Sequence, residues 1–363
     1  MALPKKIQDQ RKELVDQVVK DIENGKPFFW DSGHCGKQPR NLLKAMKGED
    51  KYYRGINAVQ LTVSSMKNGF TDSRWATFKQ AQEAGGRIKK GAKGTHIEYW
   101  QYTKDVMEIN PKTGKKEPVY EIDPDTGEKR KKQVLLEYPI VKSYVVFNGD
   151  QIEGIEKEVQ PIIKHEDKNE YMENMLKNSE AKIFYDQANR NFYSPAKDEI
   201  HVMPREKFKT MDAFYATTGH EIAHSTGAPK RLDRETLKNN DGFGKENYAR
   251  EELRAELTSM FLQQRYNVKF DEEHYKNHAA YLQNWAQVIK NDPNEIYRAA
   301  ADAEKAMGYI ETRMIKKNLT KEKSVQKETA LENKPVQKRV IKQKITMKFD
   351  TQKSKSKERT LTR

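Results

Sequence analysis

The chain has 363 residues, with 68 lysines and arginines against 54 aspartates and glutamates, and its formal net charge is +14. This length suffices for two ordinary domains, although 35% hydrophobic residues is below the roughly 45–50% apolar content of typical globular chains. No apolar run approaches the roughly 18 residues of a membrane helix, the N-terminus has no apolar signal sequence, and the single cysteine, Cys35, excludes a disulfide framework. We therefore expect a cytoplasmic protein without a membrane partner.

The charge is distributed in three blocks. Residues 1–150 carry a net charge of +8, residues 151–313 carry −5 and residues 314–363 carry +11. A basic block, an acidic block and a basic tail favour two domains with different partners, although charge can also vary between domains for solubility alone. The composition predicts an N-terminal domain over 1–154, a charged linker over 155–170, a second domain over 171–316 and a disordered basic tail over 317–363.

The first block reads as a small sheet with flanking helices. Ile7, Leu14, Val18 and Ile22 recur at helical spacing and predict a helix over 5–24. A second helix ends at Gly69, a short third helix ends at the glycine pair 85–86, and "GRIKKGAKG" leads into a strand. The turn signals "NPKTGKK" and "DPDTGEK" predict a polar hairpin excursion over 104–133, and a strand follows.

The second block is mainly helical. A helix over 168–180 precedes two or three short strands within "KIFYDQANRNFYSPAKDEIHV", and periodic segments then predict helices over 206–227, 246–266, 271–291 and 293–316. The fold class is therefore α+β in two domains, of which the first has a small sheet and the second is mainly helical.

The stretch "TTGHEIAHSTG" places His220 and His224 four residues apart. Residues at this spacing lie on the same helix face, so both imidazoles can reach one ion. Glu221, between them, is the general-base candidate, because it can take a proton from a metal-activated water. We expect Zn²⁺ as the cofactor. The alternatives are two histidines on a solvated helix, and a metal that is purely structural.

A catalytic site of this kind needs a third protein ligand. The downstream stretch "ENYAREELRAELTSMFL" offers several carboxylates, and Glu252 is the predicted ligand. Glu256, one turn further, is predicted to accept a hydrogen bond from a metal-binding histidine. The pairing could be shifted, which leaves Glu251 as an alternative ligand.

Basic and aromatic residues are interleaved in the first block, as binding of single-stranded DNA requires. The glycine-rich stretch from 85 to 94 supplies four cations, and "RGIN" and "SRWATF" add arginines and a tryptophan. Trp75 and Trp100 could equally be core residues. The predicted DNA-binding residues are Arg54, Arg74, Trp75, Arg87, Lys89, Lys90, Lys93 and Trp100.

These motifs together resemble one known family. "SPAKDEIHVMP", "FYATTGHEIAHSTGAPKRLDRE" and "YAREELRAELTSMFL" resemble the zincin-like metallopeptidase domain of ArdC-type antirestriction proteins. "YRGIN", "RWATFKQAQEAGGRIKKGAKGTHIEYW" and "YVVFNGDQIEG" resemble the N-terminal domain of the same family, which is associated with single-stranded DNA binding. The resemblance covers roughly residues 5–312. It implies metal binding by His220, His224 and Glu252, with Glu221 as base.

The resemblance implies an antirestriction protein of a mobile genetic element, which binds single-stranded DNA without strong sequence preference and carries a zinc metallopeptidase domain. A host protein is a candidate substrate of that domain. One alternative is a non-catalytic strand-binding protein with a structural or vestigial metal. Another is a replication or transfer accessory protein, such as a fragment of a primase-linked polypeptide. The chain has no GxxxxGK[ST] loop, so no ATP-driven motor is indicated.

Overall fold

The computed structural model describes residues 3–24, 37–124, 127–158, 168–239, 246–269 and 279–316, and these belong to one compact unit. Several sequence predictions lie wholly or partly outside these ranges. They concern Cys35, residues 125–126 of the second predicted turn, residues 159–167 of the linker, residues 271–278 of the helix predicted over 271–291, and the tail over 317–363.

A four-stranded sheet organises the N-terminal domain. Its strand order is β1-β2-β9-β4, with β1 and β2 parallel and the other neighbours antiparallel. Leu61 of α3, Trp75 of β2 and Val146 of β9 form the core beneath it. The elements of this domain are α1 (Lys5–Glu23), β1 (Arg40–Asn41), α2 (Leu42–Met46), α3 (Gly55–Asn68), β2 (Arg74–Ala76), α4 (Phe78–Glu83), β3 (Arg87–Ile88), β4 (Thr95–Asp105), β5 (Met107–Ile109), β6 (Lys116–Pro118), β7 (Tyr120–Ile122), β8 (Lys129–Lys131), β9 (Gln133–Asn148) and β10 (Ile152–Glu153).

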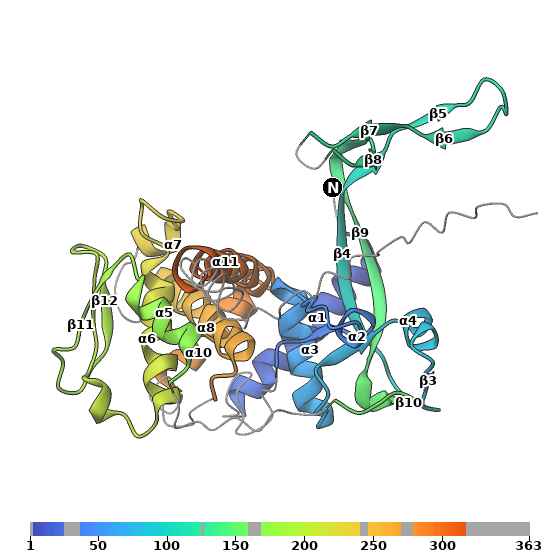
Figure 1. The fold of residues 1–363 in the computed structure, drawn as a ribbon. Coiled ribbons are helices and arrows are strands. Elements are labelled where there is room, and N and C mark those ends of the chain that lie inside the picture. The colour runs from blue at the N-terminus through green and yellow to red at the C-terminus, as the bar shows by residue number, and fades with distance from the viewer. Residues whose placement is uncertain are drawn as a thin grey trace, which may run out of the picture. The chain divides into compact units, whose positions relative to one another are not determined.

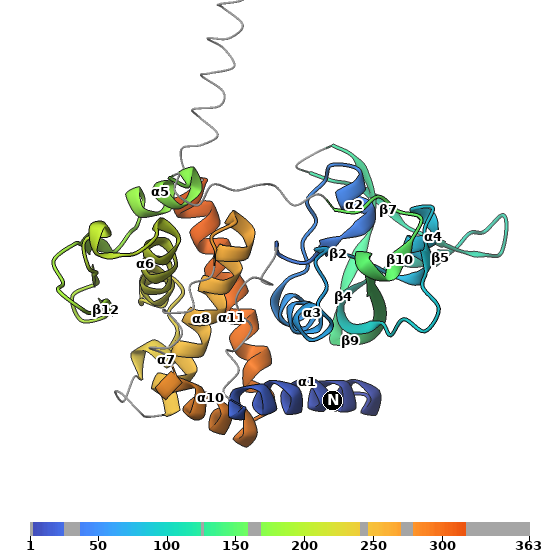
Figure 2. The same ribbon diagram turned by 90° about the horizontal axis from the view of Figure 1, so that it is seen from below.

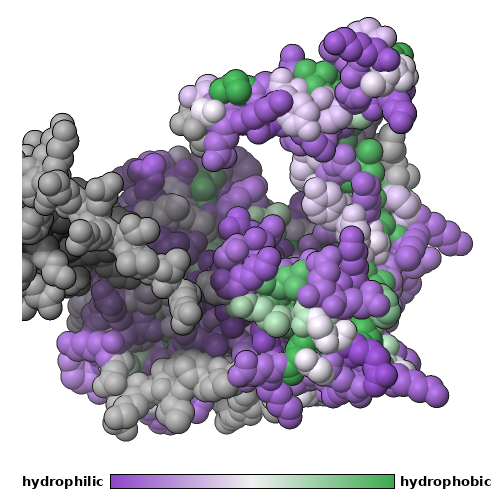
Figure 3. Space-filling model, turned by 45° about the vertical axis from the view of Figure 1, so that its right-hand side comes forward, coloured by the Kyte–Doolittle hydropathy of each residue, from purple (hydrophilic) through white to green (hydrophobic). Residues whose placement is uncertain are grey.

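Strands β4 and β9 continue past the sheet as a two-stranded arm, which carries two small hairpins at its end (Figure 1). Each predicted turn closes one hairpin, β5–β6 and β7–β8, so the excursion is confirmed as two hairpins. It is less polar than predicted, because Ile109 and Ile122 are about two-thirds exposed. Hydrophobic residues interrupt the hydrophilic surface of this arm in Figure 3.

The second domain is mainly helical, as predicted, with one three-stranded sheet of order β11-β13-β12. Helix α6 packs against α8, and α8 packs against α11 (Figures 1 and 2). The elements are α5 (Glu170–Lys177), β11 (Lys182–Phe184), β12 (Phe192–Ser194), β13 (Glu199–His201), α6 (Met211–Ser225), α7 (Glu235–Lys238), α8 (Glu246–Tyr266), α10 (Ala279–Asn291) and α11 (Glu295–Ile310), followed by a π-helical turn (Glu311–Ile315).

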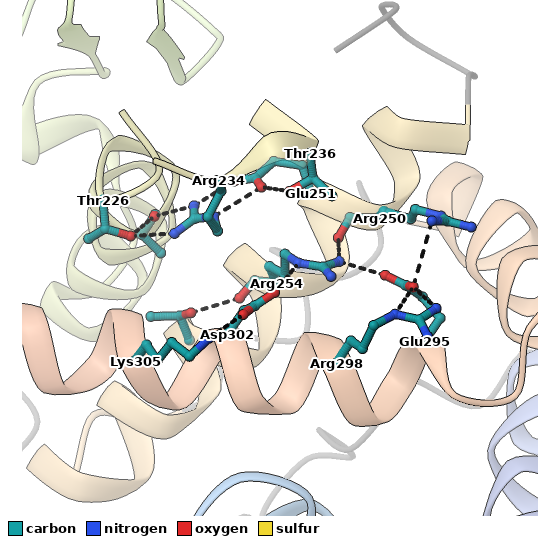
Figure 4. Close-up of polar contacts among 12 residues, drawn as sticks. Thr226, Arg234, Thr236, Arg250, Glu251, Arg254, Glu295, Arg298, Asp302 and Lys305 are labelled. Atoms are coloured by element: carbon teal, nitrogen blue, oxygen red, sulfur yellow. Dashed lines mark hydrogen bonds and ion pairs between the residues drawn. The ribbon is translucent and has the colours of Figure 1, made fainter. Parts of the chain in front are cut away.

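Buried ion pairs fix α8 to α11 (Figure 4). Arg254 of α8 donates to Glu295 over 2.7 Å and to Asp302 over 2.9 Å. The side chains of Arg254 and Glu295 are 6% and 1% exposed. Because a buried charge without its partner is strongly unfavourable, this pairing fixes the position of α8 along α11.

Residues 155–158, predicted as linker, are held by the N-terminal domain. The Glu158 carboxylate, 5% exposed, accepts from Arg40 Nη2 over 2.6 Å and from the Ser73 amide over 2.6 Å. Ile155 packs on the core of this domain. These residues of the predicted linker therefore pack on the N-terminal domain.

Among the described helices, none combines the length and the apolar character that crossing a lipid bilayer would require.

Candidate metal centre

Helix α6 carries the histidine pair through the interior of the second domain. Its first turn is capped by Thr210, whose hydroxyl accepts from the Ala213 amide over 3.1 Å. From Asp212 to Ser225 every residue is buried. A helix that is buried all round and still contains histidines and a glutamate needs partners for those polar groups.

The two imidazoles face one another and a carboxylate of α8. His220 Nε2 lies 3.1 Å from His224 Nε2. Glu252 places one carboxylate oxygen 3.5 Å from His220 Nε2 and the other 3.4 Å from His224 Nε2. The three residues offer donor atoms within 4.8 Å of one another. Two nitrogens and a carboxylate converging in this way are the donor set that Zn²⁺ and similar divalent ions take in catalytic sites.

Each histidine also has a buried carboxylate at its other ring nitrogen. His220 Nδ1 lies 3.4 Å from Glu256 Oε1, and His224 Nδ1 lies 3.3 Å from Glu251 Oε1. Both carboxylates are 1% exposed. A carboxylate at Nδ1 orients the ring so that Nε2 points to the centre, which is the arrangement found around metal-binding histidines.

The partner of His224 was missed at the sequence level, where Glu251 entered only as an alternative ligand. In the structure Glu252 faces the centre and Glu251 lies behind His224. The available signal was the Glu251-Glu252 pair, because consecutive helical residues point about 100° apart and can therefore serve two different histidine atoms.

Arg234 holds Glu251 in place (Figure 4). Its guanidinium donates to both oxygens of Glu251, over 2.5 and 3.1 Å, and to the carbonyl of Ala223 over 2.9 Å. Thr236 donates to the same carboxylate over 2.6 Å. Gly227 leaves room for this guanidinium, since a Cβ there would lie 2.8 Å from an Arg234 nitrogen.

The carboxylates around the pair favour positive charge at the centre. Burial opposes ionisation of His224, but Glu252 and Glu251 outweigh it and raise the pKa of the imidazole well above its usual value. Burial likewise opposes ionisation of Glu251, yet Arg234 and His224 lower the pKa of that carboxyl to about 2. The pKa of Glu252 is also lowered, because the two histidines outweigh its burial. The donor set therefore fits a cation.

Glu221 follows His220 on α6 and is 7% exposed. Its role as a general base stays a prediction.

Two of the predicted DNA-binding residues lie in the interior. The Trp75 ring is fully buried in the N-terminal core, so we correct that prediction: it cannot stack on a base without unfolding β2. Arg74 is 8% exposed, and its guanidinium is paired with Asp72. Arg74 is therefore also withdrawn as a phosphate contact.

The other predicted DNA-binding residues differ in their exposure and in their hydrogen-bond partners. Lys90 and Lys93 are exposed, while Lys89 donates to the Asp150 carbonyl over 2.7 Å. Arg87 is 84% exposed and pairs with Glu153, an ion pair that solvent weakens. Trp100 is half-buried, donates to Glu98 over 3.0 Å and stacks on Tyr102.

Comparison with known proteins supports this two-part organisation. Residues 8–147 match the family described as the N-terminal domain of anti-restriction factor ArdC, and residues 170–302 match a zincin-like metallopeptidase family. The chain is 36% identical over 307 residues to a DNA primase TraC of Escherichia coli, and the match covers 82% of this chain and 26% of the primase. A second DNA primase TraC of Escherichia coli is 36% identical over 304 residues, and this match covers 82% of this chain and 19% of that primase. The chain thus spans about a quarter or less of these primases.

Solved structures show the same fold. The metal-free crystal structure of the antirestriction ArdC protein from plasmid R388 has a TM-score of 0.63 and 28% identity, over 84% of this chain and 97% of that one. The Mn(II)-bound structure of that protein has a TM-score of 0.61 and 26% identity, with the same coverage. Fold and site together define a two-domain protein whose second domain is a zincin-like metallopeptidase domain with a divalent-metal site. More particularly, the chain is an ArdC-type protein, with the ArdC N-terminal domain followed by the zincin-like domain.

Proposed function

We propose that this protein is a zinc-dependent peptidase joined to a single-strand-binding domain, and that it protects incoming DNA from restriction. One observation carries the hydrolytic part of the proposal. His220, His224 and Glu252 converge on one centre, and both histidine Nδ1 atoms have their own buried carboxylate. Such a two-layered arrangement is typical of metal sites and is uncommon among histidines that serve only packing.

The three residues would hold the ion and leave a further coordination position to solvent. When bound, a divalent ion there would supply an acidified water and polarise a peptide carbonyl. Glu221 would take the proton of the attacking water and then pass it to the leaving amine. Glu256 and Glu251 keep the imidazole rings oriented through this proton transfer.

The test compares Glu221→Gln with the parent in two assays, namely cleavage of peptide libraries and protection of DNA from a restriction enzyme. We expect Glu221→Gln to retain bound metal and to lose cleavage. If protection survives in this variant, protection does not depend on peptide cleavage. If the metal-loaded parent cleaves nothing across a broad range of peptides and proteins, the peptidase assignment is wrong.

Single-strand binding by the N-terminal domain rests on its charge and on exposed cations. Residues 1–150 carry a net charge of +8, and Arg54, Lys90 and Lys93 are exposed. Phosphate contacts of this kind release counterions, so affinity should fall as salt rises. Strand binding measured at two salt concentrations tests this part without reference to the metal. The basic charge of residues 314–363 would add to it in the same salt-dependent way.

A second candidate is a non-catalytic strand-binding or transfer accessory protein with a structural metal. The similarity to two TraC primases favours it, because a module shared with much longer primases can serve strand handling without cleavage. Chelation distinguishes the two roles. A structural metal predicts that a chelator unfolds the second domain, whereas a catalytic metal predicts a folded, inactive domain.

A further inference from the structure

The N-terminal domain has a hollow between the sheet and its helices, and its lining includes Arg54, one of the exposed cations named above. Its volume is about 370 Å³, at the small end of ligand sites, and it is open to solvent. It is lined by Tyr52, Tyr53, Arg54, Asn57, Thr77, Gln80, Ile97, Glu98, Tyr99, Tyr144 and Val146.

The floor and one wall of the hollow are held by packing and hydrogen bonds. Ile97 and Tyr53 pack on the core that contains Val146, and burial raises the pKa of Tyr53 to about 12. Asn57 pairs with both the amide and the carbonyl of Glu98, over 2.9 and 2.7 Å. Asn57 thus closes the open edge of β4, and its amide belongs to the wall of the hollow.

Two tyrosines stand at the mouth with exposed rings. Tyr99 of β4 is 52% exposed and Tyr144 of β9 is 43% exposed. Their ring centroids lie 6.1 Å apart at an interplanar angle of 78°. Tyr52 differs from them, since Arg265 lies over its ring at 3.9 Å. Exposed aromatic faces above an apolar floor are what a flat heterocycle needs for stacking.

Positive charge flanks these rings. Arg54 at the rim is 73% exposed, and its ion pair with Glu304 is 3.6 Å long, so the guanidinium can turn to another anion at little cost. Lys142 is the cross-strand partner of Tyr99, lies on the same face of the strand pair and is exposed. A phosphodiester on either side of a bound base would therefore meet a cation.

We infer that this hollow binds one unpaired base of a single strand, stacked on one of the two rings of Tyr99 and Tyr144 and in edge-to-face contact with the other, with its flanking phosphates near Arg54 and Lys142. The inference rests on the proposed single-strand binding and gives it a location. A base within a duplex is stacked on both faces, so only an unpaired base can enter. Every base has an aromatic face, so the site reads no sequence.

The experiment uses the full chain and fluorescence anisotropy. The probes are a short fluorescein-labelled oligothymidylate and a strand of the same length whose interior residues are abasic. We expect Tyr99→Ala and Tyr144→Ala each to weaken oligothymidylate binding roughly tenfold, within the range known for base–aromatic stacking. Binding of the abasic strand should not change, because that strand has only phosphate contacts to lose.

Tyr138→Ala is the matched control, because Tyr138 is 54% exposed on β9 and does not line the hollow. It should bind as the parent does, and Tyr99→Phe, which keeps the ring, should too. Circular dichroism confirms that each variant is folded. If the parent binds oligothymidylate and both alanine variants bind it equally well, the hollow is not the base site while strand binding stands. If the parent binds neither strand, single-strand binding itself fails and the inference falls with it.

Discussion

Glu256→Gln tests whether the carboxylates behind the histidines serve the metal. The substitution keeps the size of the side chain and an oxygen that can accept from His220 Nδ1, and it removes the negative charge 3.4 Å away. Losing such a partner typically weakens metal binding 10- to 100-fold. Because a neutral acceptor remains, we expect the lower end, roughly tenfold or about 1.4 kcal/mol. Titration of the metal-free protein with Zn²⁺ against a competing chelator measures it.

Glu251→Gln is a useful comparison, because Glu251 lies at Nδ1 of His224, as Glu256 does at His220, and also pairs with Arg234. It should weaken metal binding by a similar factor. It should also destabilise the metal-free protein by about 3–5 kcal/mol, since the buried guanidinium of Arg234 loses its charge partner. Denaturant unfolding of both variants without metal separates the two effects. Zinc affinity of Glu256→Gln within twofold of the parent would refute the reasoning about the outer carboxylates.

Three further predictions concern stability. Arg254→Met removes one buried charge partner of Glu295, which keeps its 2.5 Å contact with Arg298, and should cost roughly 1.5–3 kcal/mol in denaturant unfolding. Lys305→Met on the exposed face of α11 should cost less than about 1 kcal/mol. Burial opposes ionisation of Glu158, but hydrogen bonds from Ser73 and Arg40 lower the pKa of this carboxyl to about 2. The ionised carboxylate therefore contributes its full stabilisation above pH 4.5 and loses it as the pH falls through about 2. The difference in unfolding free energy between the parent and Glu158→Gln should shrink with acidification, and a difference that grows would contradict this. Divalent metal at a concentration of about 100 Kd should stabilise the parent by about 2.7 kcal/mol in thermal unfolding and should leave His224→Ala nearly unchanged; an equal shift in both would place the ion elsewhere.

The sequence predicted the parts of the site that depend on local geometry. The spacing of His220 and His224 fixes their common face on any helix, and the turn residues at 110–115 and 123–128 fix the two hairpins. The choice among the acids of α8 depends on how that helix is rotated against α6. The ion pair of Arg254 on α8 with Glu295 on α11 helps to set this rotation. Because these two residues are 41 positions apart in the chain, no local sequence pattern predicts their pairing.

Tertiary packing also explains the incorrect predictions in the first block. Trp75 follows an arginine and precedes a helix, the same local setting as an exposed DNA-binding aromatic. Strand β2 lies between β1 and β9, however, and all three of its residues are buried. The pairing of Tyr99 with Tyr144 could not be predicted for the converse reason: the two residues are 45 positions apart, and only the register of β4 against β9 brings them to one face.

The identity of the ion can be argued from the donors. Two imidazole nitrogens and one carboxylate suit zinc, cobalt and manganese alike in geometry, and affinities for such mixed donors rise from Mn²⁺ to Zn²⁺. A manganese ion in the R388 relative is therefore compatible with stronger zinc binding in this chain. We expect Zn²⁺ to displace Mn²⁺ from the parent with a ratio of dissociation constants above tenfold, measured by competition with manganese detected by electron paramagnetic resonance. Equal competition would mean that oxygen donors, including solvent, dominate the site, because only then does the advantage that imidazole gives to zinc disappear.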